Sequence, residues 1–148
     1  MYTHLLLPTD GSRISSLALD DGLALAKALG AKATLLTVVE PLRSFSASSE
    51  LLADVRENFE RSSRENAGKL LQEAAGKASA LGVQANTVLA HASHPHRQVI
   101  ETATTAGCDL IVMASHGRRG VDALLMGSVT QKVLTHSSIP VLVIRSGA

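Results

Sequence analysis

Asp109 to Leu134 reads DLIVMASHGRRGVDALLMGSVTQKVL, and this stretch decides the expected fold. Its apolar start is typical of a strand that is buried on both faces. A polar, glycine-rich loop follows, and Gly127 with Ser128 can open a helix. Strand, loop and helix in this order form the unit that the rest of the chain repeats.

The remaining segments alternate in the same way. Strands are predicted at 5–7, 33–39, 83–90, 109–113 and 140–144, and helices at 12–30, 52–81, 94–107 and from 127 onward, with a loop at 43–49. Such alternation predicts one doubly wound α/β domain over residues 1–148, with helices on both faces of a parallel sheet. The helix at 52–81 has a thin apolar stripe around Ser62 and Ser63, so we expect it to be the least well packed.

Composition excludes several classes of function. The formal net charge of the 148 residues is +1, so no broad basic face is expected for binding nucleic acid. Aromatic residues make up 2 % of the chain and Trp is absent, which disfavours a base-stacking platform. No apolar stretch approaches the roughly 20 residues that span a bilayer, and no signal peptide is recognisable. We therefore expect a cytoplasmic protein that binds neither nucleic acid nor membrane.

Neither metal ligation nor thiol chemistry is expected. Cys108 is the only cysteine and lies beside the apolar run LIVMA, so it is interpreted as a small buried hydrophobe rather than a redox sensor. His91, His94 and His96 are spaced H-x-x-H-x-H, which invites a metal interpretation. They fall at a strand end and a helix start, without the i, i+4 spacing of a helical zinc pair, so a polar loop is favoured.

Two polar loops follow predicted strands, PTDGS at 8–12 and ASHGRRG at 114–120. Ligands of doubly wound sheets bind beyond the carboxyl ends of the strands, where the strand order reverses. If the first and fourth strands are neighbours, both loops line one crevice. Asp10 could be a catalytic acid, a metal ligand or a helix cap. Capping together with a ligand contact is favoured, because no second carboxylate shares its loop.

The helix that starts at Gly127 and Ser128 offers unpaired N–H groups and a positive dipole end, which attract phosphate. The hydroxyls of Ser128 and Thr130 could donate to phosphate oxygens, and Arg118 or Arg119 could neutralise charge. The alternative is that these glycines only cap a helix and turn a loop.

The spacing matches neither G-x-x-x-x-G-K-[ST] nor G-x-G-x-x-G. From Ala114 it reads Ala-x-x-Gly, nine residues, then Gly-Ser. This resembles the nucleotide-binding branch of the universal stress protein family, whose motif is G-x-x-G, nine residues, G-[ST]. The segments LLLPTDGS, LLTVVE, SHGRRG, LLMGSVTQKVL and SSIPVLVIR also resemble that family. The resemblance implies a Rossmann-like five-stranded parallel sheet of order 3-2-1-4-5, ATP or AMP in the crevice, alone or with Mg²⁺, and homodimers paired through the last strand.

Carried over by position, the resemblance implies a set of nucleotide-binding residues. They are Pro8, Thr9, Asp10 and Val38 near the adenosine, Ala114 and Gly117 near ribose and phosphate, and Gly127, Ser128, Val129 and Thr130 around the phosphates. The predicted site also includes Met113, which precedes Ala114, and His116 and Arg118 from the glycine-rich loop. Ala114 departs from the motif, which has glycine there. Its methyl group is harmless if the backbone is extended, and it lowers affinity if φ is positive or the ribose packs tightly.

The resulting prediction is an adenine-nucleotide-binding protein that acts in the stress response as a signalling or regulatory module. An enzyme is disfavoured because no activated nucleophile or assembled general base is recognisable. The alternatives are a dimeric interaction module that does not bind nucleotide, and a slow ATPase. A response-regulator receiver is disfavoured, because the third strand ends in LAHAS and the fifth in IRSG, without the Asp and Lys that a receiver needs.

Assembly is predicted from the last strand. Val141, Leu142, Val143 and Ile144 are apolar at successive positions, so we expect both faces of this strand to be buried. A final strand also lies at the edge of its sheet, where unpaired backbone groups invite another chain. Antiparallel pairing with its own copy would give a twofold homodimer.

Overall fold

The helices and strands alternate along the chain, as the sequence predicts. The strands are β1 (His4–Pro8), β2 (Lys32–Val39), β3 (Ala85–His91), β4 (Leu110–Ala114) and β5 (Val141–Ile144). The helices are α1 (Arg13–Leu29), α2 (Ser49–Leu81), α3 (Pro95–Ala106) and α4 (Ser128–His136). The structure, a computed structural model, describes residues 1–42, 49–117 and 125–146, with side chains from residue 53 onward in the second of these ranges.

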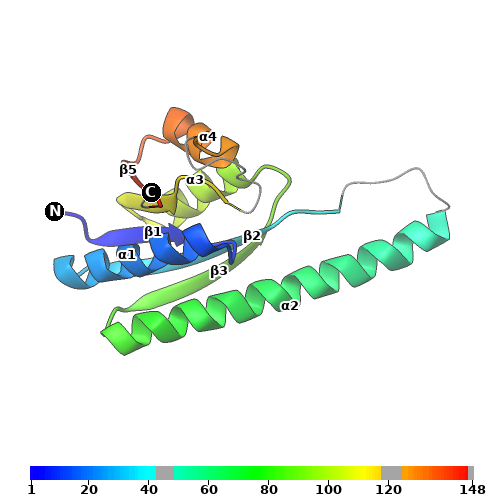
Figure 1. The fold of residues 1–148 in the computed structure, drawn as a ribbon, viewed down its shortest axis with the longest axis horizontal. Coiled ribbons are helices and arrows are strands. Elements are labelled where there is room, and N and C mark those ends of the chain that lie inside the picture. The colour runs from blue at the N-terminus through cyan, green and yellow to red at the C-terminus, as the bar shows by residue number, and fades with distance from the viewer. Residues whose placement is uncertain (43–48, 118–124, 147–148) are drawn as a thin grey trace.

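The five strands form one parallel sheet in the order β3-β2-β1-β4-β5 (Figure 1). The chain winds outward from β1 first to one side and then to the other, so the strand order reverses between β1 and β4. The predicted doubly wound fold with order 3-2-1-4-5 is therefore confirmed.

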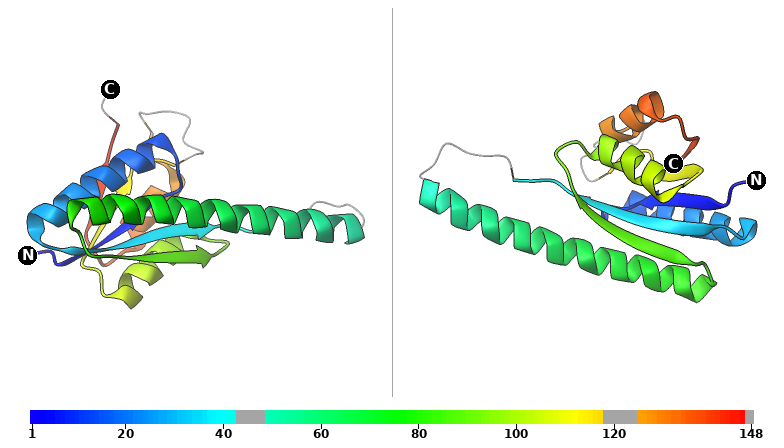
Figure 2. Two further views of the ribbon diagram at one scale, coloured as in Figure 1. Left: turned by 90° about the horizontal axis from the view of Figure 1, so that it is seen from below. Right: turned by 180° about the vertical axis from the view of Figure 1, so that it is seen from behind.

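Two apolar cores hold the helices to the sheet, one on each face (Figure 2). Leu5 and Leu7 of β1 belong to the core under α1 and α2, and Leu6 belongs to the core under α3 and α4. All three side chains are fully buried. Each such burial stabilises the fold by about 1.5–3 kcal/mol, which explains why the central strand is apolar at successive positions.

The predicted helix starts and stops are present. Ser12 caps α1, because its side-chain oxygen accepts a hydrogen bond from the backbone N–H of Ser15 at 3.3 Å. Pro95 is the first residue of α3, where its missing N–H costs nothing. Gly30 and Gly107 end α1 and α3 in the left-handed conformation, with φ of 66° and 77°.

Helix α2 extends beyond the edge of the sheet (Figure 1). Its residues from 53 to 62 are all exposed, including Val55 at 48 % and Phe59 at 40 %. Burial begins at Ala67 and continues through Leu71 and Ala78, which join the core under α1 and α2. The expectation that this helix is the least well packed is correct, because its first half has no sheet beneath it.

Both edge strands differ from the sequence-based expectation. The backbone N–H of Val83 donates to the carbonyl of Ala78 at 2.9 Å, so Val83 closes α2 and β3 begins only at Ala85. In β3 all seven residues are half-buried or exposed. Leu142 of β5 is 42 % exposed, so the prediction that both faces of the last strand are buried is wrong for the single chain. Helices cover an edge strand only in part, so some of its side chains remain exposed.

Candidate functional site

The two polar loops meet at the carboxyl edge of the sheet, because β1 and β4 are neighbours. The Asp10 carboxylate lies against the backbone of Gly117, so a Cβ atom at position 117 would collide with Asp10 Oδ2. The two loops were expected to lie at one edge if the first and fourth strands were neighbours, and this expectation is confirmed. Glycine at 117 allows the close approach between the loops.

The first loop is fixed by β2. Pro8 ends β1, and the backbone N–H of Thr9 donates to the carbonyl of Leu36 at 2.8 Å. The hydroxyl of Thr37 donates to the carbonyl of Thr9 at 3.0 Å. Thr9 is buried by these contacts. The backbone of Thr9 therefore sets the direction in which Asp10 leaves the sheet.

Asp10 connects the start of α1 with the second loop. Its Oδ1 accepts a hydrogen bond from the backbone N–H of Ser12 at 2.9 Å, while its own N–H donates to the Ser15 hydroxyl at 3.3 Å. Ser12 is thus the helix cap, so the expectation that Asp10 caps this helix is wrong. Asp10 instead holds the backbone of the cap residue. The same carboxylate contacts Gly117 through Oδ2. Asp10 is consequently held between two elements of the carboxyl edge.

Helix α4 begins directly beside the second loop. The backbone N–H of Gly127 donates to the carbonyl of Ser115 at 2.7 Å, and a Cβ at position 127 would lie 3.0 Å from His116 Cα. The N–H of Gln131 donates to the carbonyl of Gly127 at 3.0 Å, as the first backbone bond of this helix. The N–H groups of residues 128–130 precede that bond and have no acceptor within the helix. These donors sit at the positive end of the helix dipole.

The side chains at the start of α4 have different surroundings. The Thr130 hydroxyl is buried and donates to the carbonyl of Ala114 at 2.8 Å, so it anchors α4 to the end of β4. The expectation that this hydroxyl donates to a phosphate therefore needs correction, and Thr130 offers its backbone N–H instead. Ser128 is exposed, and Val129 is half-buried against the core under α3.

Ala114 ends β4 with an extended backbone and pairs with Ile144. No residue other than glycine has positive φ in the described part of the chain. Ala114 is 7 % exposed, and its methyl group packs with Ile14 and Ala18 of α1. Helix α4 covers the opposite face of the sheet. The methyl group thus fills a small core cluster and introduces no backbone strain.

The other predicted residues lie around this edge in different ways. Met113 is buried in the core under α3 and α4, and Val38 packs against the same core while half-buried. His116 is half-buried, with Nδ1 3.2 Å from the Ser115 hydroxyl. Arg118 lies outside the described residues.

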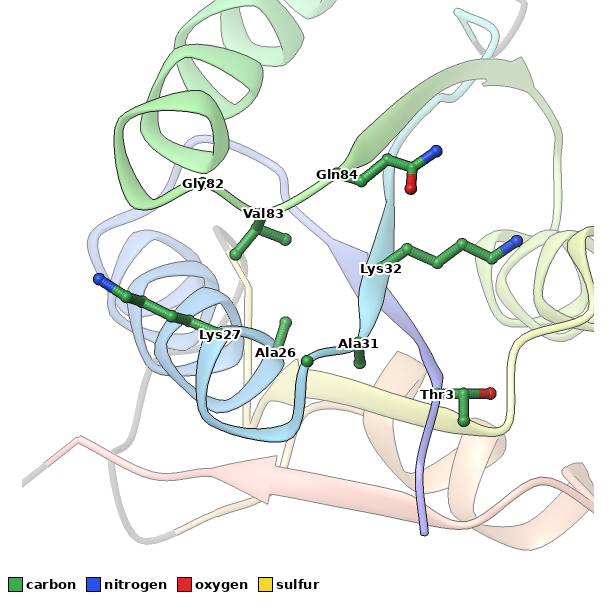
Figure 3. Close-up of a pocket in the computed structure, with 9 residues that line it drawn as sticks. Thr3, Ala26, Lys27, Ala31, Lys32, Gly82, Val83 and Gln84 are labelled. Atoms are coloured by element: carbon green, nitrogen blue, oxygen red, sulfur yellow. The ribbon is translucent and has the colours of Figure 1, made fainter.

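A hollow of about 390 Å³ opens at the opposite, amino edge of the sheet (Figure 3). Its lining includes Gly30 and Gly82, which end α1 and α2, and the side chains of Lys27 and Lys32. These two lysines point away from each other (Figure 3). Helix ends present carbonyl oxygens rather than N–H donors, so this hollow has no converging anion donors.

A buried polar group at the amino edge was not predicted from the sequence. His4 Nε2 is hydrogen-bonded to the Thr34 hydroxyl at 2.7 Å, and both residues are buried. Burial lowers the pKa of the His4 ring, and the nearby charge of Lys32 lowers it further. Burial raises the pKa of the Cys108 thiol, in agreement with its interpretation as a small buried hydrophobe. A single histidine before an apolar run carries no signal that would have identified this group.

Asp109 holds the N-terminal segment against β4. It accepts hydrogen bonds from the backbone N–H and hydroxyl of Thr3 at 2.9 and 3.1 Å, and from the N–H of His4 at 3.0 Å. Loss of solvent opposes ionisation of this carboxyl, but the donated hydrogen bonds outweigh it and keep the pKa of Asp109 below its usual value. This carboxylate has a structural role.

Within residues 1–42, 49–117 and 125–146, no three side chains of His, Cys, Asp or Glu are grouped so that they could hold a metal ion. The described helices also include none that is both long and apolar enough to cross a membrane.

Comparison with known proteins assigns the family. The sequence model of the universal stress protein family matches residues 1–145, a range that contains both loops, α4 and every strand. The chain belongs to the universal stress protein family. The family suggested by the two loops and the start of α4 is therefore confirmed.

Related proteins match this chain over nearly their whole length. The universal stress protein YxiE of Bacillus subtilis is 33 % identical over 149 residues, covering 98 % of this chain and 100 % of the relative. MJ0577 of Methanocaldococcus jannaschii is 30 % identical over 155 residues, covering 98 % and 96 %. The solved structure of MJ0577 superposes with a TM-score of 0.83 at 25 % identity, covering 100 % and 99 % of the two chains. A universal stress protein solved in complex with cAMP has a TM-score of 0.72 at 24 % identity, covering 99 % and 98 %, which shows a shared fold.

Proposed function

We propose that this universal stress protein binds an adenine nucleotide, ATP or AMP, alone or with Mg²⁺, at the carboxyl edge of its sheet. In the stress response it acts as a signalling or regulatory module. The observation that carries the proposal is the start of α4, where the N–H groups of residues 128–130 have no acceptor within the helix. Gly117 and Gly127 flank this start, and at both positions a side chain would meet a neighbouring loop residue.

The phosphates of the nucleotide bind to the backbone N–H groups of Ser128, Val129 and Thr130 and to the exposed Ser128 hydroxyl. The adenosine extends toward the first loop, along Pro8 and Thr9. The Asp10 carboxylate accepts a hydrogen bond from the adenine amino group, and Val38 contributes apolar contact at the same end. The donors for the phosphates thus lie at the start of α4, and the acceptor for the adenine lies on the first loop, at the same edge of the sheet.

Two further points support the proposal. The extended backbone at Ala114 removes the conflict that a positive φ would have produced with the family motif. The fold can also hold such a ligand, since a universal stress protein of this fold was solved in complex with cAMP. For this chain the support comes from its own residues at the carboxyl edge.

Calorimetric titration with ATP and Mg²⁺, and separately with AMP, tests the proposal. Ser128→Ala removes a hydrogen bond to a charged phosphate, worth about 1.5–3 kcal/mol, so affinity is expected to fall roughly tenfold to a hundredfold. Ser79→Ala is the matched control, because Ser79 is an exposed serine on α2. No binding by the wild type, or equal affinity in both variants, would contradict the site.

We also propose a homodimer formed by antiparallel pairing of β5 with its copy. This strand ends the order of the sheet, its Leu142 is exposed, and Pro140 stands just before it, where a missing N–H costs little. Light scattering is expected to give twice the 15.4 kDa of one chain, and Val143→Lys to shift the mass toward the monomer. A wild-type monomer at tens of micromolar would rule this dimer out.

A further inference from the structure

Three histidine rings lie close together, two from the start of α3 and one from the end of α4. These two helices cover the same face of the sheet (Figure 1). The His96 ring centre lies 6.2 Å from that of His94 and 5.8 Å from that of His136. His94 and His136 are exposed, and His96 is half-buried. The proposed nucleotide site uses none of these side chains.

The charges that act on the His96 ring are all positive, and the carboxylate of α3 nearest to them along the chain is that of Glu101, one turn beyond Arg97. Lys132 of α4 and Arg97 of α3 act on the His96 ring, together with the other two imidazoles. Both permanent cations are exposed, and neither is within ion-pair distance of a carboxylate in the described part of the chain. His94, His96, Arg97, Lys132 and His136 are called the α3–α4 basic surface below.

Protonation of this surface needs no rearrangement. Nδ1 of His136 lies 2.9 Å from the carbonyl oxygen of Lys132, and a carbonyl can only accept, so Nδ1 carries the proton. A second proton on Nε2 would leave this bond intact. His96 resists its proton more strongly, since partial burial and then the charge of Lys132 lower the pKa of its ring.

The geometry favours an extended anion over a compact one. Pro95 has no N–H, and the N–H groups of Arg97 and Gln98 both donate to the carbonyl of His94, at 3.1 and 3.3 Å. The start of α3 therefore keeps only the N–H of His96 without an acceptor within the helix, whereas the start of α4 offers three such groups. What remains is a spread of side-chain charges over two helices, and a chain with several carboxylates can contact them one by one.

We propose that the α3–α4 basic surface docks an acidic segment of a partner protein, and that docking tightens as the pH falls through the range in which histidine titrates. The proposal concerns a different part of the molecule from the nucleotide site and does not depend on it. Two cations are present at every physiological pH, whereas an imidazole side chain in general adds charge only in mild acid. Exposed opposite-charge contacts are individually weak, so the charges added in mild acid should together tighten docking about tenfold.

Fluorescence anisotropy of a labelled hexaglutamate peptide tests the proposal on the full chain, at low ionic strength and with EDTA present to remove metals. Affinity is expected to be about tenfold higher near pH 5.5 than near pH 8. The triple variant His94→Gln, His96→Gln, His136→Gln should lose most of this difference. His91→Gln should keep it, because His91 is exposed at the end of β3 and outside the cluster.

A pair of lysine variants separates a local surface from a general effect of net charge. Lys132→Gln and Lys69→Gln change the net charge equally, and both lysines are exposed, on α4 and α2 respectively. Only Lys132→Gln should weaken binding of the peptide. Neither variant should change the affinity for ATP. Equal effects of the two, absence of binding, or binding that is independent of pH would overturn the proposal. Tighter binding of inorganic tripolyphosphate than of hexaglutamate would overturn it too, in favour of a compact phosphate ligand.

Discussion

At the amino edge of the sheet, the side chains of His4, Thr34 and Asp109 are hydrogen-bonded to protein groups. At the carboxyl edge, the first N–H groups of α4 have no acceptor within their helix, and the Ser128 hydroxyl is exposed. No buried side-chain nitrogen or oxygen of the described residues lacks a partner. Polar groups at the first edge therefore serve stability, whereas those at the second can serve a ligand.

Substitutions at the two edges should therefore change different properties of the protein. Removing a polar partner at the amino edge leaves a buried group unsatisfied, which lowers the free energy of unfolding. Altering the start of α4 should change ligand affinity first, because the N–H groups of residues 128–130 have no acceptor within the helix. Measuring the free energy of unfolding and the nucleotide affinity of each variant tests whether the two edges act independently.

The largest effect is expected from Gly127→Val. A Cβ at this position would lie 3.0 Å from the backbone of His116, and a branched side chain would also enter the space of the phosphate. Nucleotide affinity should fall by more than about a hundredfold, or roughly 2.7 kcal/mol, in calorimetric titration. Gly76→Val is a control for the substitution itself, because a Cβ at Gly76 has nothing within 4 Å. Retained affinity in Gly127→Val would show that the phosphate binds elsewhere.

At the amino edge, Thr34→Val should lower the free energy of unfolding by about 1–3 kcal/mol, because His4 Nε2 then loses its partner inside the protein. Nucleotide affinity should be unchanged. Urea unfolding measures the first quantity and titration the second. Thr87→Val is the matched variant, since Thr87 is exposed on β3. A comparable loss of stability in both variants would mean that the pair with His4 is not what stabilises this edge.

The pH dependence of stability should follow from His4. Burial, followed by the charge of Lys32, lowers the pKa of its ring below the usual value of about 6.5. The unfolded chain therefore takes up a proton more readily than the folded protein. The stabilisation is complete above pH 6.5 and is lost as the pH falls through and below that value.

Urea unfolding at a series of pH values checks this prediction. His4→Gln should reduce the fall in the free energy of unfolding at acid pH, called the acid limb here, because an amide can bond to Thr34 without titrating. The limb should not vanish, since the pKa of His96 is lowered as well, first by burial. His91→Gln serves as the exposed control. An acid limb that is identical in wild type and His4→Gln would remove His4 as its cause.

Much of this architecture could be predicted from the sequence, for local reasons. The strands are runs of apolar residues between glycine or proline, and capping by Ser12, Pro95 and Gly107 marks helix boundaries within a residue or two. The placing of both loops at one edge followed from the alternation and the family resemblance together. These features depend on neighbours along the chain.

What could not be predicted depends on contacts between distant segments. The hydroxyl of Thr130 was expected to face a phosphate, but it bonds to the carbonyl of Ala114, sixteen positions earlier. Likewise, His4 meets Thr34 only because β1 pairs with β2. Exposure of Leu142 depends on how far the helices reach over the sheet, which no local pattern encodes.

The smallest effect is expected from Ala114→Gly, which restores the glycine of the family motif. The methyl group packs with Ile14 and Ala18 under α1, and the backbone at 114 is extended, so neither obstructs a ligand beside α4. Affinity for ATP should change by less than about threefold, or roughly 0.6 kcal/mol. Stability should fall by about 1 kcal/mol, because glycine in a strand gains backbone freedom on unfolding and the buried methyl is lost. Titration and urea unfolding of the same preparation measure both changes. Distinctly tighter binding by Ala114→Gly would mean that this methyl obstructs the nucleotide after all, and the carboxyl edge would then be coupled to the core beneath α1.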